Sequence, residues 1–176
     1  MKKKLSLLAF SMLPIFLLAG RANAQSASTD PVTVNINLSA EVISIVLGGS
    51  PDVTFNYPTA ASYTVPQTVP KLGHFTVISN QNYDVTVSGT APFSNANSAT
   101  PIPLNVVTVA VDPATANGGA VAPVILSGTA QPVVSGATPT GGATYNVNYS
   151  IPDATPLLGR SPLIYSTTVV YTATQL

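Results

Sequence analysis

The stretch that decides the fold runs from Pro31 to Leu47 and reads P-V-T-V-N-I-N-L-S-A-E-V-I-S-I-V-L. Apolar and polar residues alternate from Val32 to Leu38, and a second alternating run follows from Ile43 to Leu47. This period of two is typical of β-strands that turn one face toward a core. We therefore predict two strands here. The first can pair within its own fold or complete a neighbouring molecule.

Residues 1–24 have the three parts of a secretory signal peptide. A basic start, an apolar run from Leu5 to Leu18 and a small-x-small cleavage motif at 22–24 follow one another. The run contains Pro14 and is 14 residues long, shorter than the ~20 residues that a membrane-spanning helix requires. We expect cleavage after residue 24, no membrane span afterwards, and export to the cell surface or, alternatively, to the periplasm.

The mature chain, residues 25–176, carries few charges. Two basic side chains, Lys71 and Arg160, stand against six acidic ones, which gives a net charge of −4. Nucleic-acid binding requires clustered basic residues, so this composition excludes it. Eight charged residues among 152 are far below the ~25% of ordinary domains. Copies of such a chain repel one another weakly, which favours a subunit that packs against others.

Composition and spacing together predict an all-β fold. The chain has no cysteine, which excludes disulfides and thiolate metal sites, and its 16 prolines and 12 glycines oppose helices. Short alternating runs between turn signals predict a single Ig-like antiparallel β-sandwich of about seven to nine strands over residues 25–176. Besides the opening pair, strands are expected at 52–57, 72–79, 83–88, 104–111, 122–126, 131–134, 144–151 and 163–174, with a hairpin turn at 80–82.

No motif indicates catalysis, a cofactor or a metal site, and we predict a protein that is not an enzyme. His74, the one histidine, is interpreted as an ordinary surface or boundary residue. Asp52, Asp112 and Asp153 stand next to proline, where aspartate stabilises turns. They could bind calcium only if the loops bring several oxygen atoms together. The strand tyrosines are expected at the core edge with their hydroxyls at the rim, and an exposed tyrosine platform for sugar is the alternative.

Three segments resemble those of the cysteine-free bacterial fimbrial major subunits, of the alpha or class 5 type. They are the opening V-T-V-N-I-N-L-S-A-E-V-I-S-I, the hairpin-like F-T-V-I-S-N-Q-N-Y-D-V-T-V-S-G and the ending Y-S-T-T-V-V-Y-T-A-T-Q-L. The resemblance implies an incomplete sandwich whose missing edge strand comes from residues 31–38 of the next subunit. It also implies a homopolymer or other surface subunits as partners, with an export chaperone.

Strand donation has a simple physical basis, because an open sheet edge offers backbone groups for pairing and pockets for alternate side chains. The residues expected to enter the pockets are Val32, Val34, Ile36 and Leu38. The alternative interpretation is a monomeric secreted or periplasmic sandwich. There, the same strand pairs within its own molecule and the protein binds glycan or matrix.

Overall fold

The computed structural model describes residues 33, 35–38 and 40–176. The chain divides into two units, Met1–Leu38 and Ser39–Leu176, and the second contains all the described strands. The expected signal peptide at 1–24 lies outside the described residues, as do Val32 and Val34 of the expected first strand.

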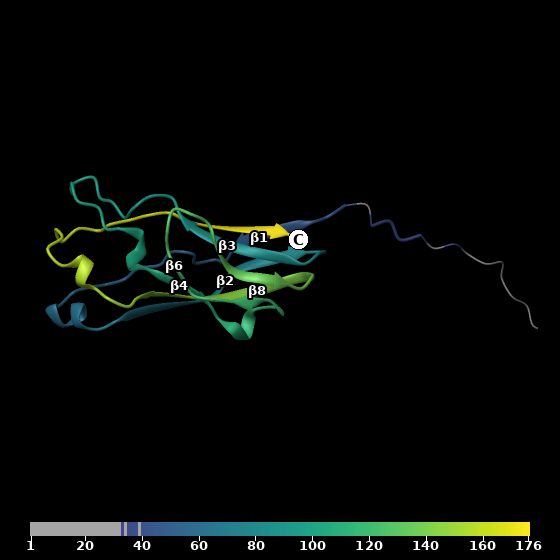
Figure 1. Ribbon diagram of the computed structural model, residues 1–176, viewed down its shortest axis with the longest axis horizontal. Coiled ribbons are helices and arrows are strands. Elements are labelled where there is room, and N and C mark those ends of the chain that lie inside the picture. Colours follow the sequence, from purple (N-terminus) through teal and green to yellow (C-terminus); the bar gives the residue numbers. More distant parts are fainter. Residues whose placement is uncertain (1–32, 34, 39) are drawn as a thin grey trace, which may run out of the picture. The chain divides into compact units, whose positions relative to one another are not determined.

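The second unit is a sandwich of two antiparallel sheets (Figure 1). The five-stranded sheet has the order β1-β2-β8-β4-β6, and the four-stranded sheet has the order β5-β7-β3-β9. The strands are β1 (Ile43–Leu47), β2 (Gln67–Ser79), β3 (Tyr83–Gly89), β4 (Thr108–Val111), β5 (Ala120–Val121), β6 (Val124–Ile125), β7 (Gln131–Ala137), β8 (Thr140–Ile151) and β9 (Val169–Gln175). Four short 3-10 turns, η1 (Ala60–Thr64), η2 (Leu104–Val106), η3 (Pro113–Thr115) and η4 (Thr155–Leu157), connect them. The predicted all-β sandwich is confirmed.

The core lies between β3 and β8, the two strands whose alternation is most regular. β3 buries every second residue over its length, and β8 buries Tyr145, Val147, Tyr149 and Ile151. Each of these strands has a partner on both flanks, since β3 lies between β7 and β9 and β8 lies between β2 and β4. Full burial of a side chain of this size contributes about 1.5–3 kcal/mol, so these strands supply much of the stability.

A pair of buried tyrosines joins the two sheets. Tyr83 of β3 and Tyr145 of β8 are both fully buried, and their hydroxyl oxygens lie 2.6 Å apart. The Asn117 amide also donates to the Tyr83 hydroxyl, at 3.2 Å. Burial raises the pKa of Tyr145, and its hydrogen bond to Tyr83 raises that pKa further. The expectation that these hydroxyls lie at the rim was wrong, because each finds a partner inside the core.

The turn at 80–82 does not close the expected hairpin. β2 belongs to the five-stranded sheet and β3 to the four-stranded one, so the turn crosses between the layers. Asn80 holds it by binding the residues just before β1: its side-chain oxygen accepts from the Val42 backbone amide at 2.8 Å, and its side-chain nitrogen donates to the Ala40 carbonyl at 2.9 Å. Both alternating strands were predicted correctly, but their pairing was not.

Other boundaries also differ from the expectation. The segment 52–57 and residues 163–168 are in no strand, although Ser166 forms an isolated bridge with Ser94. The expected strand at 104–111 begins as the turn η2, and its second half, β4, lies between β6 and β8 as expected of a central strand. Pro70 lies inside β2, at a position where β2 has a ladder with β8 but not with β1. Proline is tolerated there because one flank needs no amide donor.

A bulge in β2 turns two successive residues inward. The pairing of β2 with β8 shifts between Lys71 and Phe75, and Gly73 has a φ of +59°, which favours glycine. His74 and Phe75 are consequently both buried, so the interpretation of His74 as an ordinary surface or boundary residue was wrong. A Cβ on Gly48 would lie 2.2 Å from the Gly73 carbonyl oxygen, so this close approach also requires glycine.

The tyrosine pair predicts an asymmetric mutational cycle. We expect Tyr83→Phe to cost about 1–3 kcal/mol, because it leaves the buried Tyr145 hydroxyl without a partner. Tyr145→Phe should cost less, because the Asn117 amide still donates to Tyr83. The double variant should cost less than the sum of the single ones. Urea unfolding measures all three, and strictly additive losses would contradict the pairing.

Candidate functional site

The last strand, β9, stands at the end of the four-stranded sheet and pairs with β3 alone among the described residues. β1 stands at the end of the other sheet, and the two edge strands contact each other (Figure 1). At one end the Gln175 side chain bridges them, donating to the Val42 carbonyl at 2.8 Å and to the Asn80 side-chain oxygen at 2.9 Å. We call β1, the segment 50–57 that follows it, and β9 the open edge.

The core is incompletely covered at the open edge. Val169, Tyr171 and Ala173 point inward from β9 and pack against the core, yet none is fully buried. The neighbouring β3 buries every residue of its inner face. Val85 of β3, for example, lies opposite Ala173 and has no exposed surface. The difference arises because β3 has a strand on each flank and β9 has a strand on one.

The segment 50–57 has the side-chain pattern of a strand without the ladder of one. Val53, Phe55 and Tyr57 are half-buried and pack against the core, whereas the residues between them are exposed. Such alternation arises when an extended chain lies on a core with one face outward. The strand expected at 52–57 is absent among the described residues, although Val53, Phe55 and Tyr57 share one face as residues of a strand would.

Side chains, not backbone bonds, tie this segment to β2. The ammonium group of Lys71 donates to the Ser50 carbonyl oxygen at 3.1 Å, and the Gln67 amide donates to the Asn56 carbonyl oxygen at 2.8 Å. β8 pairs with one flank of β2, and β1 pairs with part of the other. The two side-chain bonds therefore place the segment on the same flank of β2 as β1. The segment thus continues β1 along the open edge.

A buried polar chain lies behind the open edge. The Nε2 atom of His74 lies 2.8 Å from the Tyr149 hydroxyl, which in turn lies 2.6 Å from the Tyr171 hydroxyl. The chain joins β2 and β8 of one sheet to β9 of the other. Burial raises the pKa of Tyr149 to about 12 and also raises the pKa of Tyr171, so both hydroxyls stay protonated. The Nδ1 atom of His74 is buried without a hydrogen-bond partner.

The residues expected to be donated do not form a strand where the structure describes them. Residues 33 and 35–38 lie outside any strand, and Ile36 and Leu38 are 83% and 89% exposed. Exposed apolar residues in alternation suit pairing with another surface. The family resemblance implied an open sheet edge, but the sequence did not identify β9 as the strand that forms it.

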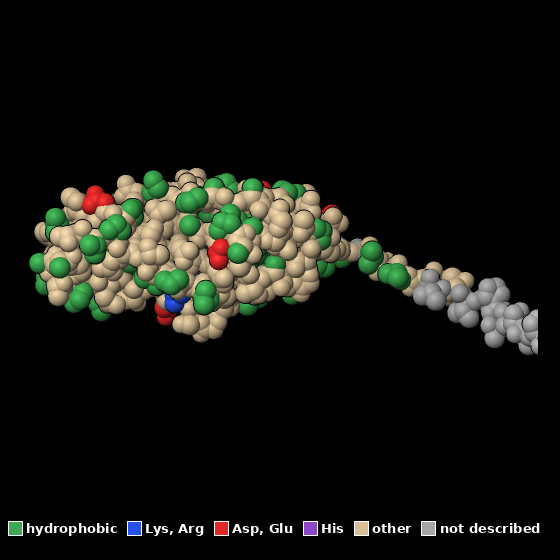
Figure 2. All heavy atoms as spheres, turned by 90° about the horizontal axis from the view of Figure 1, so that it is seen from below, with side chains coloured by type: hydrophobic (Ala, Val, Ile, Leu, Met, Phe, Trp, Pro, Cys, Tyr) green, Lys and Arg blue, Asp and Glu red, His purple; other side chains and the backbone are tan. Residues whose placement is uncertain are grey.

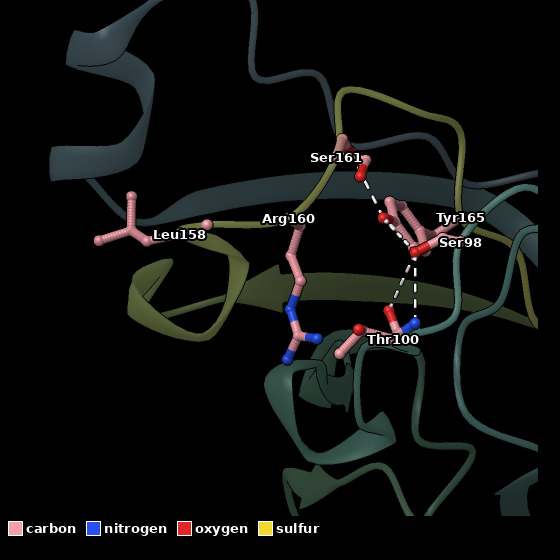
Figure 3. Close-up of a pocket in the computed structure, with 7 residues that line it drawn as sticks. Ser98, Thr100, Leu158, Arg160, Ser161 and Tyr165 are labelled. Carbon is pink, nitrogen blue, oxygen red and sulfur yellow. Dashed lines mark hydrogen bonds between the residues drawn. The ribbon is translucent and has the colours of Figure 1, made fainter.

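A small hollow lies between two loops, 98–100 and 158–165, and has a volume of about 260 Å³. Its lining residues are Ser98, Thr100, Leu158, Gly159, Arg160, Ser161 and Tyr165. Figure 3 shows the Arg160 side chain next to the group formed by Tyr165, Ser98 and Thr100. The Tyr165 hydroxyl donates to the Ser98 hydroxyl at 3.0 Å and fixes one loop against the other. Sequence reasoning missed the hollow, because loops distant in the chain form it.

Charged groups are sparse on the surface of the second unit, as Figure 2 shows for one face. Asp112 and Asp153 stabilise turns as expected: each accepts a hydrogen bond from the backbone amide two residues later. The described residues contain no group of three or more His, Cys, Asp or Glu side chains that could hold a metal ion. No helix within the described residues reaches the length and hydropathy needed to cross a bilayer.

Comparison with known proteins adds a distant structural likeness. No protein-family model and no curated protein match the chain. Among solved structures, the chain is similar to one of a chaperone–usher pilus, reported for the molecular basis of rod uncoiling. The TM-score is 0.42 and the identity 11%, over 88% of this chain and 100% of that chain. A likeness at this level does not place the chain in a family.

Because His74 is buried, we predict that the protein loses stability in mild acid. Burial, and secondly the charge of Lys71, lower the pKa of His74 from its ordinary 6.5. Below about pH 6.5 the unfolded chain binds a proton that the folded chain does not, so the free energy of unfolding falls until the pH reaches the lowered pKa. Above pH 6.5 both states are neutral at this residue, and it contributes no pH dependence.

Urea unfolding between about pH 7.5 and 5.5 measures this effect, since carboxylates titrate mainly below that range. The matched control is His74→Gln, which keeps a hydrogen-bonding group facing Tyr149 but does not titrate. We expect the free energy of unfolding to decrease with falling pH in the natural chain and to stay constant in the variant. Equal slopes in both proteins would exclude His74 as the cause.

Proposed function

We propose that this chain is a non-enzymatic, exported subunit of a bacterial surface fibre, similar to a fimbrial subunit, and that it assembles by strand donation. Residues 31–38 of one copy pair along β9 of the next copy. The observation that carries the proposal is the inner face of β9, which packs on the core but remains half-exposed at the end of its sheet. Because the donated segment and the open edge belong to different parts of the chain, the contact is head-to-tail and extends into a fibre.

The dimensions of the two partners agree. At about 3.3 Å per residue, the eight residues 31–38 span about 26 Å and the seven residues of β9 span about 23 Å. A donated strand would pair with the free flank of β9, and its alternate side chains would cover the core. Val32, Val34, Ile36 and Leu38 are the side chains on the inward face.

The surface chemistry also supports assembly. Eight charges in the mature chain impose little repulsion between copies, and a fibre places many copies in contact. An apolar edge of this kind needs protection before assembly, so an export chaperone is a reasonable partner. The fibre would be located on the cell surface, where it would serve structure or adhesion.

Substitutions on opposite faces of the donated strand test the proposal. Ile36→Asp places a charge in the covered core and should abolish fibres, because a buried unpaired carboxylate is costly. Asn37→Asp introduces the same charge on the outward face and should leave fibre formation nearly unchanged. Electron microscopy of the exported material measures the outcome. Equal fibre yields from the two variants would overturn the proposal.

A deletion separates donation between molecules from pairing within one molecule. A chain that lacks residues 26–38 should remain folded, bind a synthetic peptide of residues 31–38 and cap existing fibres without extending them. A monomeric sandwich that pairs the strand internally would instead unfold. Size-exclusion chromatography and thermal unfolding distinguish the two results.

A further inference from the structure

We infer that the hollow lined by Arg160 and Tyr165 is a binding site for a carboxylate-bearing monosaccharide unit. This inference does not depend on strand donation, since none of the seven residues that line the hollow belongs to the open edge. It rests on a positioned guanidinium beside a group of hydroxyls, in a depression of about 260 Å³.

Arg160 is held so that the outer end of its guanidinium remains available. Its Nε atom donates to the Pro156 carbonyl oxygen at 3.2 Å, which is the one side-chain hydrogen bond that it makes within the described residues. The turn η4 and Gly159, with a φ of +73°, direct the chain into this position. No acidic residue lines the hollow. Two terminal nitrogens are therefore free to bind a carboxylate in a paired geometry.

The opposite wall is fixed before any ligand arrives. The Asn95 side chain donates to the Ile164 carbonyl at 2.8 Å, and the Ser94–Ser166 bridge joins the same two loops. The Tyr165 hydroxyl lies on Ser98, whose own hydroxyl accepts from the Thr100 amide at 3.4 Å. A wall whose loops are tied together loses little conformational entropy on binding.

The lining chemistry favours a sugar acid over other anions. The hydroxyls of Thr100 and Ser161 can both donate and accept, which matches the hydroxyls of a pyranose. The half-buried Tyr165 lies beside them, and the Arg160 fork selects the carboxylate. A phosphate-binding site would instead be expected to gather several cations or backbone amides. Arg160 is the one basic residue in the lining.

The test uses the full mature chain and two sugar acids, glucuronate and N-acetylneuraminate, as probes. Titration by NMR should give dissociation constants of about 1 mM, as expected for one small ligand in an open depression. Arg160→Gln should weaken binding at least about tenfold. Lys71→Gln removes the same charge from the other basic position and should leave binding unchanged. Thermal unfolding should show that both variants remain folded.

Two further measurements make the inference falsifiable. Tyr165→Phe removes only the hydroxyl that ties the loops, and should weaken binding of both sugar acids by about threefold to tenfold. Glucose has the sugar ring without the carboxylate, and acetate has the carboxylate without the ring. Each should bind at least tenfold more weakly than glucuronate. If acetate binds as well as glucuronate, or if Arg160→Gln and Lys71→Gln behave alike, the inference is wrong.

Discussion

The rest of the structure depends on the ladder between β3 and β9, because it alone holds the final strand in the four-stranded sheet. This ladder runs over all seven residues of β9 and places Val169, Tyr171 and Ala173 over the core. No strand pairs with the other flank of β9 within the described residues, and the three side chains remain half-exposed. A cysteine-free sandwich has no disulfide to compensate, so hydrophobic burial and buried hydroxyl pairs must supply the cohesion between sheets.

The two tyrosine pairs serve this purpose in different places. Tyr83 and Tyr145 join the centres of the sheets, where both side chains are fully buried. Tyr149 and Tyr171 join β8 to the edge strand β9, and His74 extends that pair to β2. Aromatic contacts reinforce the second group: the ring of Phe75 lies 4.9 Å from Tyr171 and 4.8 Å from Tyr145. The edge strand is therefore anchored through its side chains as well as its backbone.

The sequence predicts elements well where period-two alternation is the dominant physical constraint. β3 and β8 follow from such alternation, because each has a single face that can be buried. Pairing is harder to predict, because the residues 80–82 permit either a return into the same sheet or a crossing to the other one. The inward turn of His74 depends on a bulge at Gly73, and an isolated glycine in a strand does not reveal on which face the next residue lies.

Sites that are formed by tertiary contacts were even harder to predict from the sequence. The hollow requires the loop near Ser98 to meet the loop near Arg160, and no sequence spacing encodes that encounter. The open edge required knowing that β9 is the last strand of its sheet and that the segment 50–57 leaves the ladder. The alternation of Val53, Phe55 and Tyr57 correctly indicated the face that packs against the core, but the predicted strand is absent, because alternation reports only which face is buried. It does not report whether the backbone has a partner.

Tyr171 links the open edge to the interior, and its position determines how a donated strand would act on the rest of the fold. Its ring belongs to the half-exposed face of β9, whereas its hydroxyl ends the chain that begins at His74. A strand laid along β9 would cover the ring and exclude water from that end of the chain. Lower polarity strengthens the hydrogen bonds and penalises a charged imidazole further, so the pKa of His74 would fall again. Mild acid would thus oppose assembly as well as folding, because the assembled state would be the one that resists protonation of His74 most.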